Sequence, residues 1–104
     1  MYEPKVGDKL YLRQFTGNYW VDMVKRPYTV CGVQGRTIYV QKCKLIFHGP
    51  CYYDTVADEI EADPRGQVVK MRWSEKKQRW QETPADTYPQ VAVFGKWEHQ
   101  PYLN

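Results

Sequence analysis

Four cations within residues 67–80 have the clearest potential to bind a ligand. Lys70 and Arg72 alternate with the apolar residues of a period-two pattern, so they share one face of a predicted strand. Lys77 and Arg79 follow a polar run and return beside them if that run closes a hairpin. We call Lys70, Arg72, Lys77 and Arg79 the basic face. Positive side chains arranged in this way attract phosphate groups and other anions.

A second group of candidate binding residues combines aromatic rings with cations: Tyr19, Trp20, Lys25 and Arg26. In a nucleic-acid complex, such cations contact phosphates while the rings stack on bases. In a protein complex, tyrosine, tryptophan and arginine are the residue types enriched at interface hot spots. Exposed sheet faces also carry lysine and arginine for solubility alone, so the residue types by themselves do not decide among these roles.

Cys43, His48 and Cys51 form the group most similar to a metal site, with Cys31 and His99 as two further candidates. Structural zinc sites use ligand pairs at C-x2–4-C spacing, and the sequence contains no such pair. We therefore expect free thiols and no bound metal or other cofactor.

Nucleophilic catalysis requires a cysteine or serine beside a histidine and an orienting acid. Cys51, His48 and Asp54 are close in sequence, but catalytic triads depend on spatial geometry and not on adjacency. The sequence contains no nucleophile-elbow, phosphate-loop or dinucleotide-binding motif. These observations predict that the protein is not an enzyme.

The elements that position these residues are predicted to be short strands. Glycine and proline interrupt the chain at intervals of about strand length. A symmetric turn at residues 75–78 places Trp73 directly across from Trp80, and such an aromatic pair fixes the register of the two strands. Further strands are predicted at residues 9–15, 44–47 and 91–94.

Residues 28–43 are predicted to form another hairpin. A three-residue loop at residues 33–35 places Val30 opposite Ile38 and Tyr28 opposite Val40. These four side chains then share one face, as a core-facing register requires. The predicted core consists of Leu10, Leu12, Val30, Ile38, Val40, Leu45, Phe47, Val69, Met71, Trp73, Val91 and Val93.

One helix is predicted, over residues 54–62. Asp54 or Thr55 provides the N-cap, and Val56 and Ile60 lie four residues apart on one helical face. The acidic residues in the first turn suit the helix dipole. A helix this short is marginal by itself, so we expect it to pack on the sheet.

At 104 residues, the chain has the size of a single β-rich domain, which we assign to residues 1–104. Its net charge of +3 and pI near 8.7 make it mildly basic, below the pI of about 9 that marks dedicated nucleic-acid domains. The sequence shows no signal peptide, lipidation motif or apolar run long enough to span a membrane. We expect a cytoplasmic protein with reduced thiols.

Residues 6–12, Val-Gly-Asp-Lys-Leu-Tyr-Leu, resemble the first strand of SH3-like small β-barrels, where a Val/Gly/Asp turn precedes an apolar strand. The excursion over residues 15–27 and the hairpin over residues 28–41 are similar in order to that class. The resemblance covers about the first 45 residues and implies a small barrel. The short, aromatic-rich chain without an enzyme motif also resembles accessory proteins of bacteriophages and mobile elements.

We therefore predict a mainly β protein, a small partly open SH3-like barrel or sheet with one short helix near residues 54–62. The first functional hypothesis is a non-catalytic binding module whose aromatic and basic surface acts on a protein partner or on a second copy of the chain. The alternative is a nucleic-acid-binding barrel that uses the basic face. A small anionic ligand is a third kind of partner, and no membrane association is expected.

Overall fold

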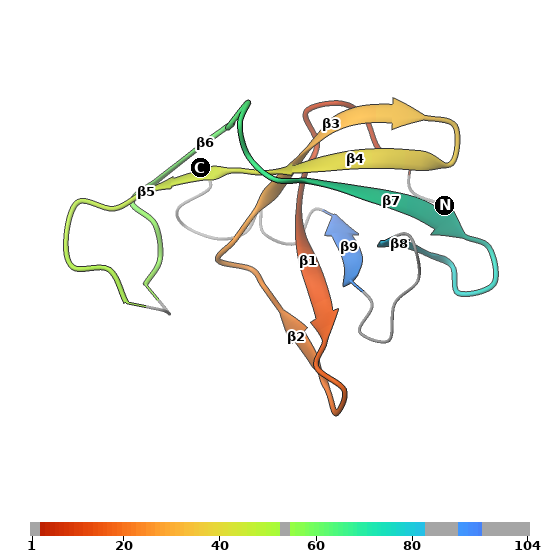
Figure 1. Ribbon diagram of the computed structural model, residues 1–104, viewed down its shortest axis with the longest axis horizontal. Coiled ribbons are helices and arrows are strands. Elements are labelled where there is room, and N and C mark those ends of the chain that lie inside the picture. Colours follow the sequence, from red (N-terminus) through yellow and green to blue (C-terminus); the bar gives the residue numbers. More distant parts are fainter. Residues whose placement is uncertain (1–2, 53–54, 83–89, 95–104) are drawn as a thin grey trace.

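The computed structural model describes residues 3–52, 55–82 and 90–94, and every regular element within these ranges is a strand (Figure 1). The strands are β1 (Lys9–Phe15), β2 (Trp20–Asp22), β3 (Tyr28–Gln34), β4 (Thr37–Lys42), β5 (Lys44–Ile46), β6 (Glu59–Glu61), β7 (Val68–Ser74), β8 (Arg79–Glu82) and β9 (Gln90–Phe94). Over the same ranges, the chain contains no helix long and apolar enough to cross a membrane.

Six of these strands form a small closed barrel in the order β1-β3-β4-β7-β8-β9. The barrel closes because the other edge of β1 pairs with β9. β1 pairs with β9 over Leu10–Gln14, while Lys9 and Leu10 pair with the start of β3. The prediction of a mainly β small barrel is confirmed. The barrel is closed and not partly open, because β1 provides pairing partners along both of its edges.

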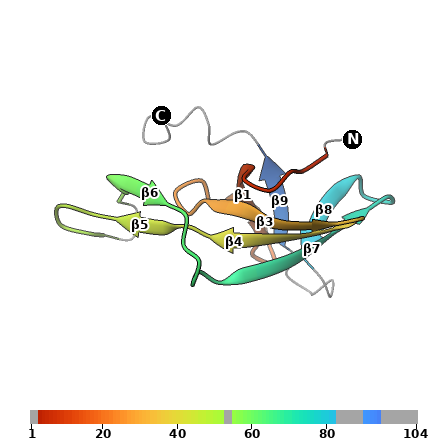
Figure 2. The same cartoon turned by 90° about the horizontal axis from the view of Figure 1, so that it is seen from above.

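The remaining three strands extend this barrel. β2 folds back on the second half of β1, so the excursion after β1 is itself a hairpin. β5 and β6 pair with each other as a separate two-stranded sheet, which we call the arm. Figure 2 shows the arm extending away from the barrel strands.

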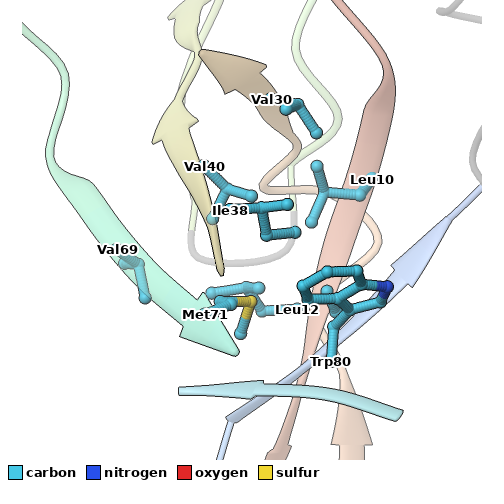
Figure 3. Packing of buried hydrophobic residues seen from close by; sticks show 9 residues of the cluster. Leu10, Leu12, Val30, Ile38, Val40, Val69, Met71 and Trp80 are labelled. Atoms are coloured by element: carbon cyan, nitrogen blue, oxygen red, sulfur yellow. The ribbon is translucent and has the colours of Figure 1, made fainter. Parts of the chain in front are cut away.

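Period-two alternation places one apolar face of each barrel strand toward the interior (Figure 3). The buried cluster consists of Leu10, Leu12, Val30, Ile38, Val40, Val69, Met71, Trp80 and Ala92. Tyr28, Trp73 and Phe94 pack against it as partly buried side chains. The prediction of a core position was wrong for Leu45 and Phe47, which are half-buried on or beside the arm, outside this cluster. Val93 is half-buried and Val91 is buried. Both lie outside the cluster, because they pair with Tyr11 and Arg13, on the side of β1 opposite to Leu10 and Leu12.

The predicted pairing of Trp73 with Trp80 is confirmed. The two residues lie directly opposite each other across β7 and β8, with ring centroids 5.5 Å apart in an edge-on arrangement. The four-residue turn closes when Gln78 adopts a φ of 53° and its backbone N–H donates to the carbonyl of Ser74 at 2.7 Å. Trp80 is the more deeply buried ring, since only 4% of its surface is exposed.

The predicted hairpin over residues 28–43 forms, but its loop and register differ from the prediction. The turn has two residues, Gly35 and Arg36, and Gly35 adopts a φ of 61°. Val30 lies opposite Val40, and Tyr28 lies opposite Lys42. A bulge between Val30 and Gly32 adds one residue to β3. This bulge compensates for the shorter turn, so Val30, Ile38 and Val40 still face the core, whereas Val33 is exposed.

The predicted helix over residues 54–62 is wrong. Residues 55–58 have no regular structure, and Glu59–Glu61 is strand β6, paired with β5. Lys44 lies opposite Glu61, and the carboxylate of Asp58 accepts a hydrogen bond from the backbone N–H of His48 at 2.7 Å. The segment also alternates acidic and apolar residues, so pairing with β5 prevails over a helix propensity that is weak at this length.

Gly66 connects the arm to the barrel in a turn that presses against β4. The side-chain amide of Gln41 donates to the carbonyls of Pro64 and Gly66, each at 3.1 Å. The backbone N–H of Lys42 donates to the carbonyl of Gln67 at 2.9 Å. A Cβ atom at Gly66 would overlap the backbone oxygen of Lys42, so the turn requires glycine for close approach.

We expect Trp80→Ala to lower the free energy of unfolding by about 3–5 kcal/mol, because it removes a large side chain from the centre of the core. Trp73→Ala should cost less, because Trp73 is only partly buried. Lys76→Ala, in the exposed turn, serves as the control and should change stability by no more than about 0.5 kcal/mol. Urea unfolding followed by circular dichroism measures all three. A larger effect of Trp73→Ala than of Trp80→Ala would contradict this assignment of the two rings.

We expect Gly66→Ala to destabilise the protein by at least about 1–3 kcal/mol, the usual cost of forcing extra atoms into a packed site. Gly49→Ala is the matched control, because no atom lies within 4 Å of a Cβ built there and its backbone is not in the left-handed region. Thermal unfolding of the two variants provides the comparison. Equal midpoints would show that the 63–66 turn is not tightly held against β4.

Candidate binding face

The strand residues of the basic face lie on the outer surface of the barrel. Along β7, exposed Lys70 and Arg72 alternate with buried Val69 and Met71. Lys70 is paired with Tyr39 on β4, whereas Arg72 is paired on its two sides with Thr37 and Gln81. The predicted alternation of β7 is therefore confirmed, with the cations on the outer face.

This outer face spans three neighbouring strands, and its cations lie on two of them, β7 and β8. In the described ranges, its outward positions carry no carboxylate; they are Thr37, Tyr39, Gln41, Val68, Lys70, Arg72, Ser74, Arg79 and Gln81. Glu82 follows on β8 but lies opposite Met71, on the core-facing side. Acidic residues instead concentrate on and beside β6, at Asp58, Glu59 and Glu61. The chain therefore separates a basic barrel face from an acidic arm.

Arg79 connects the basic face with the aromatic group of the β1–β2 hairpin. Its guanidinium lies over the ring of Trp20, 5.3 Å from the ring centroid. Its Nε–H donates to the side-chain oxygen of Gln81 at 3.3 Å. The Trp20 ring also contacts Phe15, with centroids 5.2 Å apart and planes inclined by 46°. Two residues that are far apart in sequence, Trp20 and Arg79, thus belong to one surface.

An ion pair on the outer side of β1 holds the β1–β2 hairpin in place. Arg13 donates two hydrogen bonds to the carboxylate of Asp22, at 2.6 Å and 3.2 Å. The Tyr11 hydroxyl donates to the same carboxylate at 3.3 Å. Burial, followed by the nearby Asp22 charge, raises the pKa of Tyr11, so the phenol stays protonated as a donor. These contacts fix β2 on β1 and therefore fix the position of Trp20.

The second group of candidate binding residues, which combines aromatic rings with cations, does not lie together in the structure. Tyr19 and Trp20 lie at the tip of the β1–β2 hairpin, with 64% and 40% of their surfaces exposed. Lys25 and Arg26 follow the opposite end of β2, in the bend that leads to β3, and both are half-buried. Lys77 lies in the turn between β7 and β8 and is exposed there, beyond the paired rows of the strands.

Three residues of this surface were not among the predicted site residues. Gln81 separates Arg72 from Arg79, and Phe15 supports the ring of Trp20. Tyr39 lies beside Lys70, with its ring packed over Gly32, where an added Cβ would approach the ring to 3.3 Å. Period-two alternation around Trp80 and Ile38 indicates that Gln81 and Tyr39 face outward. The contact of Phe15 with Trp20 depends on the pairing of β1 with β2.

The candidate metal and thiol residues are not gathered into a site. Within the described ranges, no three His, Cys, Asp or Glu side chains lie close enough to hold a metal ion, and Cys31, Cys43 and Cys51 are free thiols. Cys43 is buried and lies 3.2 Å from the Thr29 hydroxyl. His48 is exposed, 3.7 Å from Glu59. Asp54 and His99 lie outside the described residues.

No family model, curated protein or solved structure matches this chain. The geometry and chemistry of the barrel face are therefore the basis for assigning a function to this chain.

Burial raises the pKa of the Cys43 thiol above its ordinary value, and this effect outweighs the opposing hydrogen bond with Thr29. A smaller thiolate fraction and an inaccessible sulfur both slow disulfide exchange. At mildly alkaline pH, we expect exposed Cys31 and Cys51 to react with DTNB first and Cys43 to react only when the protein unfolds. A Cys43→Ser variant identifies the slow thiol. Three equally fast thiols in the native protein would contradict the burial of Cys43.

Proposed function

We propose that this chain is a non-catalytic binding module that engages a protein partner through the surface joining the basic face to the tip of the β1–β2 hairpin. The observation that carries this proposal is the cation–π contact of Arg79 with Trp20, with exposed Tyr19 next to Trp20 in the chain. Tyrosine, tryptophan and arginine dominate the energetics of protein interfaces because they combine large contact area with directional polar groups. Here these three residue types occur together on the exterior of a rigid barrel.

The side chains of this surface are suited to binding and not to bond cleavage. They are guanidinium and ammonium groups, an amide and aromatic rings, which supply hydrogen bonds, charge and contact area. The positions of Trp20 and Arg79 are fixed before any partner arrives, because Arg13 and Asp22 hold the hairpin and Gln81 holds Arg79. Ordering side chains in advance lowers the entropic cost of association.

We also propose that the barrel is related to SH3-like barrels and that the protein acts in the cytoplasm. The order of β1, the excursion through β2 and the β3–β4 hairpin supports an SH3-like barrel, with the arm and the β7–β8 hairpin as elaborations. We infer a cytoplasmic protein, consistent with three free cysteines, two of them exposed. We propose as well that the protein is an accessory protein of a bacteriophage or mobile element.

Nucleic acid is the second candidate partner, and one specific observation favours it. The outward positions of β4, β7 and β8 that the structure describes carry three cations and no carboxylate. A surface of that kind attracts phosphates. The small net charge of +3 weighs against it, since dedicated nucleic-acid domains are more basic.

The two candidates differ in how strongly binding depends on salt. For single-stranded DNA or RNA, fluorescence anisotropy should give a log–log salt slope of roughly −0.7 per neutralised phosphate. The double variant Arg72→Gln/Arg79→Gln should then flatten the slope by about 1.5 units. We expect no measurable oligonucleotide binding at low salt. Tight binding with a steep slope would make nucleic acid the partner.

For a protein partner, binding should depend on the hairpin tip. We expect Trp20→Ala to weaken capture of the partner from a lysate of the source organism by at least about 30-fold, the effect of losing a 2 kcal/mol hot spot. Tyr52→Ala is the matched control, because Tyr52 is 69% exposed but lies after β5, beside the arm. If both variants weaken capture of the partner equally, or if neither weakens it, the hairpin tip is not part of the interface.

A further inference from the structure

We propose that Arg72 and Arg79, on either side of Gln81, form a carboxylate-binding site that receives an acidic segment of the partner protein. This inference rests on the proposed function and specifies the chemistry of the partner. The site lies on the outer face of the β7–β8 hairpin, next to Trp20.

The strand register brings the two arginines together. Arg72 lies directly opposite Gln81, and Arg79 precedes Gln81 by two residues on the same face of β8. Arg72 and Arg79 are therefore diagonal neighbours, whose Cα atoms are typically about 7–8 Å apart in an antiparallel pair. At that separation, the guanidinium groups of two long side chains can reach the same oxyanion.

Arg79 is oriented before a ligand binds. Its Nε–H is engaged with the Gln81 side-chain oxygen, and the guanidinium is held over the Trp20 ring. These two contacts leave the terminal nitrogens of the guanidinium as the donors available to a ligand. Two parallel N–H donors match the two oxygens of a carboxylate, which gives a short and directional charge-assisted pair. Because its oxygen accepts from Arg79, the Gln81 amide retains its NH₂ group as a further donor.

The electrostatics of the face favour an anion at this point. Like charges at neighbouring cross-strand positions repel each other and destabilise the pair. Within the described ranges, no carboxylate on β4, β7 or β8 faces outward to offset Arg72 and Arg79. A carboxylate supplied by a partner would relieve this repulsion, whereas Arg13 and Arg36 already have their own carboxylates in Asp22 and Glu75.

The surroundings of the site favour an acidic peptide over a nucleic acid. The nearest ring, Trp20, is already in contact with both Arg79 and Phe15, so it is not a free platform for a base. Beyond it, Tyr19 provides exposed apolar area, and Val68 does the same at the other end of the outer face of β7. A segment that alternates carboxylates with apolar side chains matches both the charge and the apolar area of this surface.

The test titrates the ¹⁵N-labelled full chain with a capped heptapeptide, Ala-Asp-Glu-Ile-Glu-Ala-Asp, whose sequence is that of residues 57–63 of this chain. The comparison peptide replaces its carboxylates with amides. We expect the acidic peptide to shift the indole N–H resonance of Trp20 and the Nε–H resonance of Arg79. Arg72→Gln and Arg79→Gln should each weaken binding about tenfold or more, the effect of losing a charge-assisted hydrogen bond. Arg79→Lys should also weaken binding, because it keeps the charge but removes the planar fork.

Lys76→Gln is the matched control, since it removes one positive charge from the exposed turn of the same hairpin. It should change the affinity by less than about twofold. Equal weakening by Lys76→Gln and Arg79→Gln, or equal binding of the amide peptide, would overturn the site. Preferential binding of a single-stranded oligonucleotide at Arg72 and Arg79 would overturn the acidic segment as its occupant. A partner that still requires Trp20 but ignores both arginines would remove this site while leaving the proposed binding module intact.

Discussion

The pairing of β1 with strands on both of its edges is the constraint on which the rest of the structure depends. One edge is taken by β9, and the other is shared between the start of β3 and the whole of β2. The first pairing closes the barrel and encloses the core around Leu10 and Leu12. The second joins β2 to the end of β1 and so forms the hairpin that carries Trp20. Core formation and presentation of Trp20 therefore depend on one seven-residue strand.

This arrangement explains how residues distant in sequence come to share a surface. In a closed barrel, each strand has a neighbour on both sides. A row of paired, outward-facing residues therefore crosses the strands from Thr37 through Arg72 to Gln81. β8 and β9 pair at Gln81 and Val91, and β9 then leads to Arg13 on β1. Arg79 lies two residues before Gln81, on the same outward side of β8, and its guanidinium reaches the Trp20 ring at the hairpin tip.

The sequence supports prediction of the local features whose signal is periodic. The alternation around Met71 identifies β7 and its basic side, and the spacing of Trp73 and Trp80 determines the register of the β7–β8 hairpin. The bulge after Val30 has no comparable signal, since a bulge and a longer turn place the same apolar residues inward. For Glu59–Glu61, the local signal is misleading. The segment has some helix propensity, but it forms a strand because it pairs with β5, which is a tertiary contact.

The candidate surface was predictable to a similar extent. Each partner in the Arg79–Trp20 contact belonged to a predicted cluster, but their contact depends on barrel closure, which is a long-range property. Lys25 and Arg26 were grouped with Trp20 because they are close in sequence, yet the strand between them directs the two pairs to opposite ends. Sequence proximity is therefore a poor guide to surface composition in a chain built from short, extended segments.

The junction at the base of the arm has a consequence for the architecture of the chain. β4 and β7 are antiparallel neighbours, and the hydrogen bond from Lys42 to Gln67 closes the ladder where the arm leaves and rejoins the barrel. In topological terms, β4 and β7 are already a hairpin, and residues 43–66 are an insertion into its loop. Closing a loop of that length costs roughly 2 kcal/mol more in chain entropy than closing a tight turn, a cost small enough for the barrel to tolerate. The arm is thus a module whose sequence and length can change while the basic face stays in register.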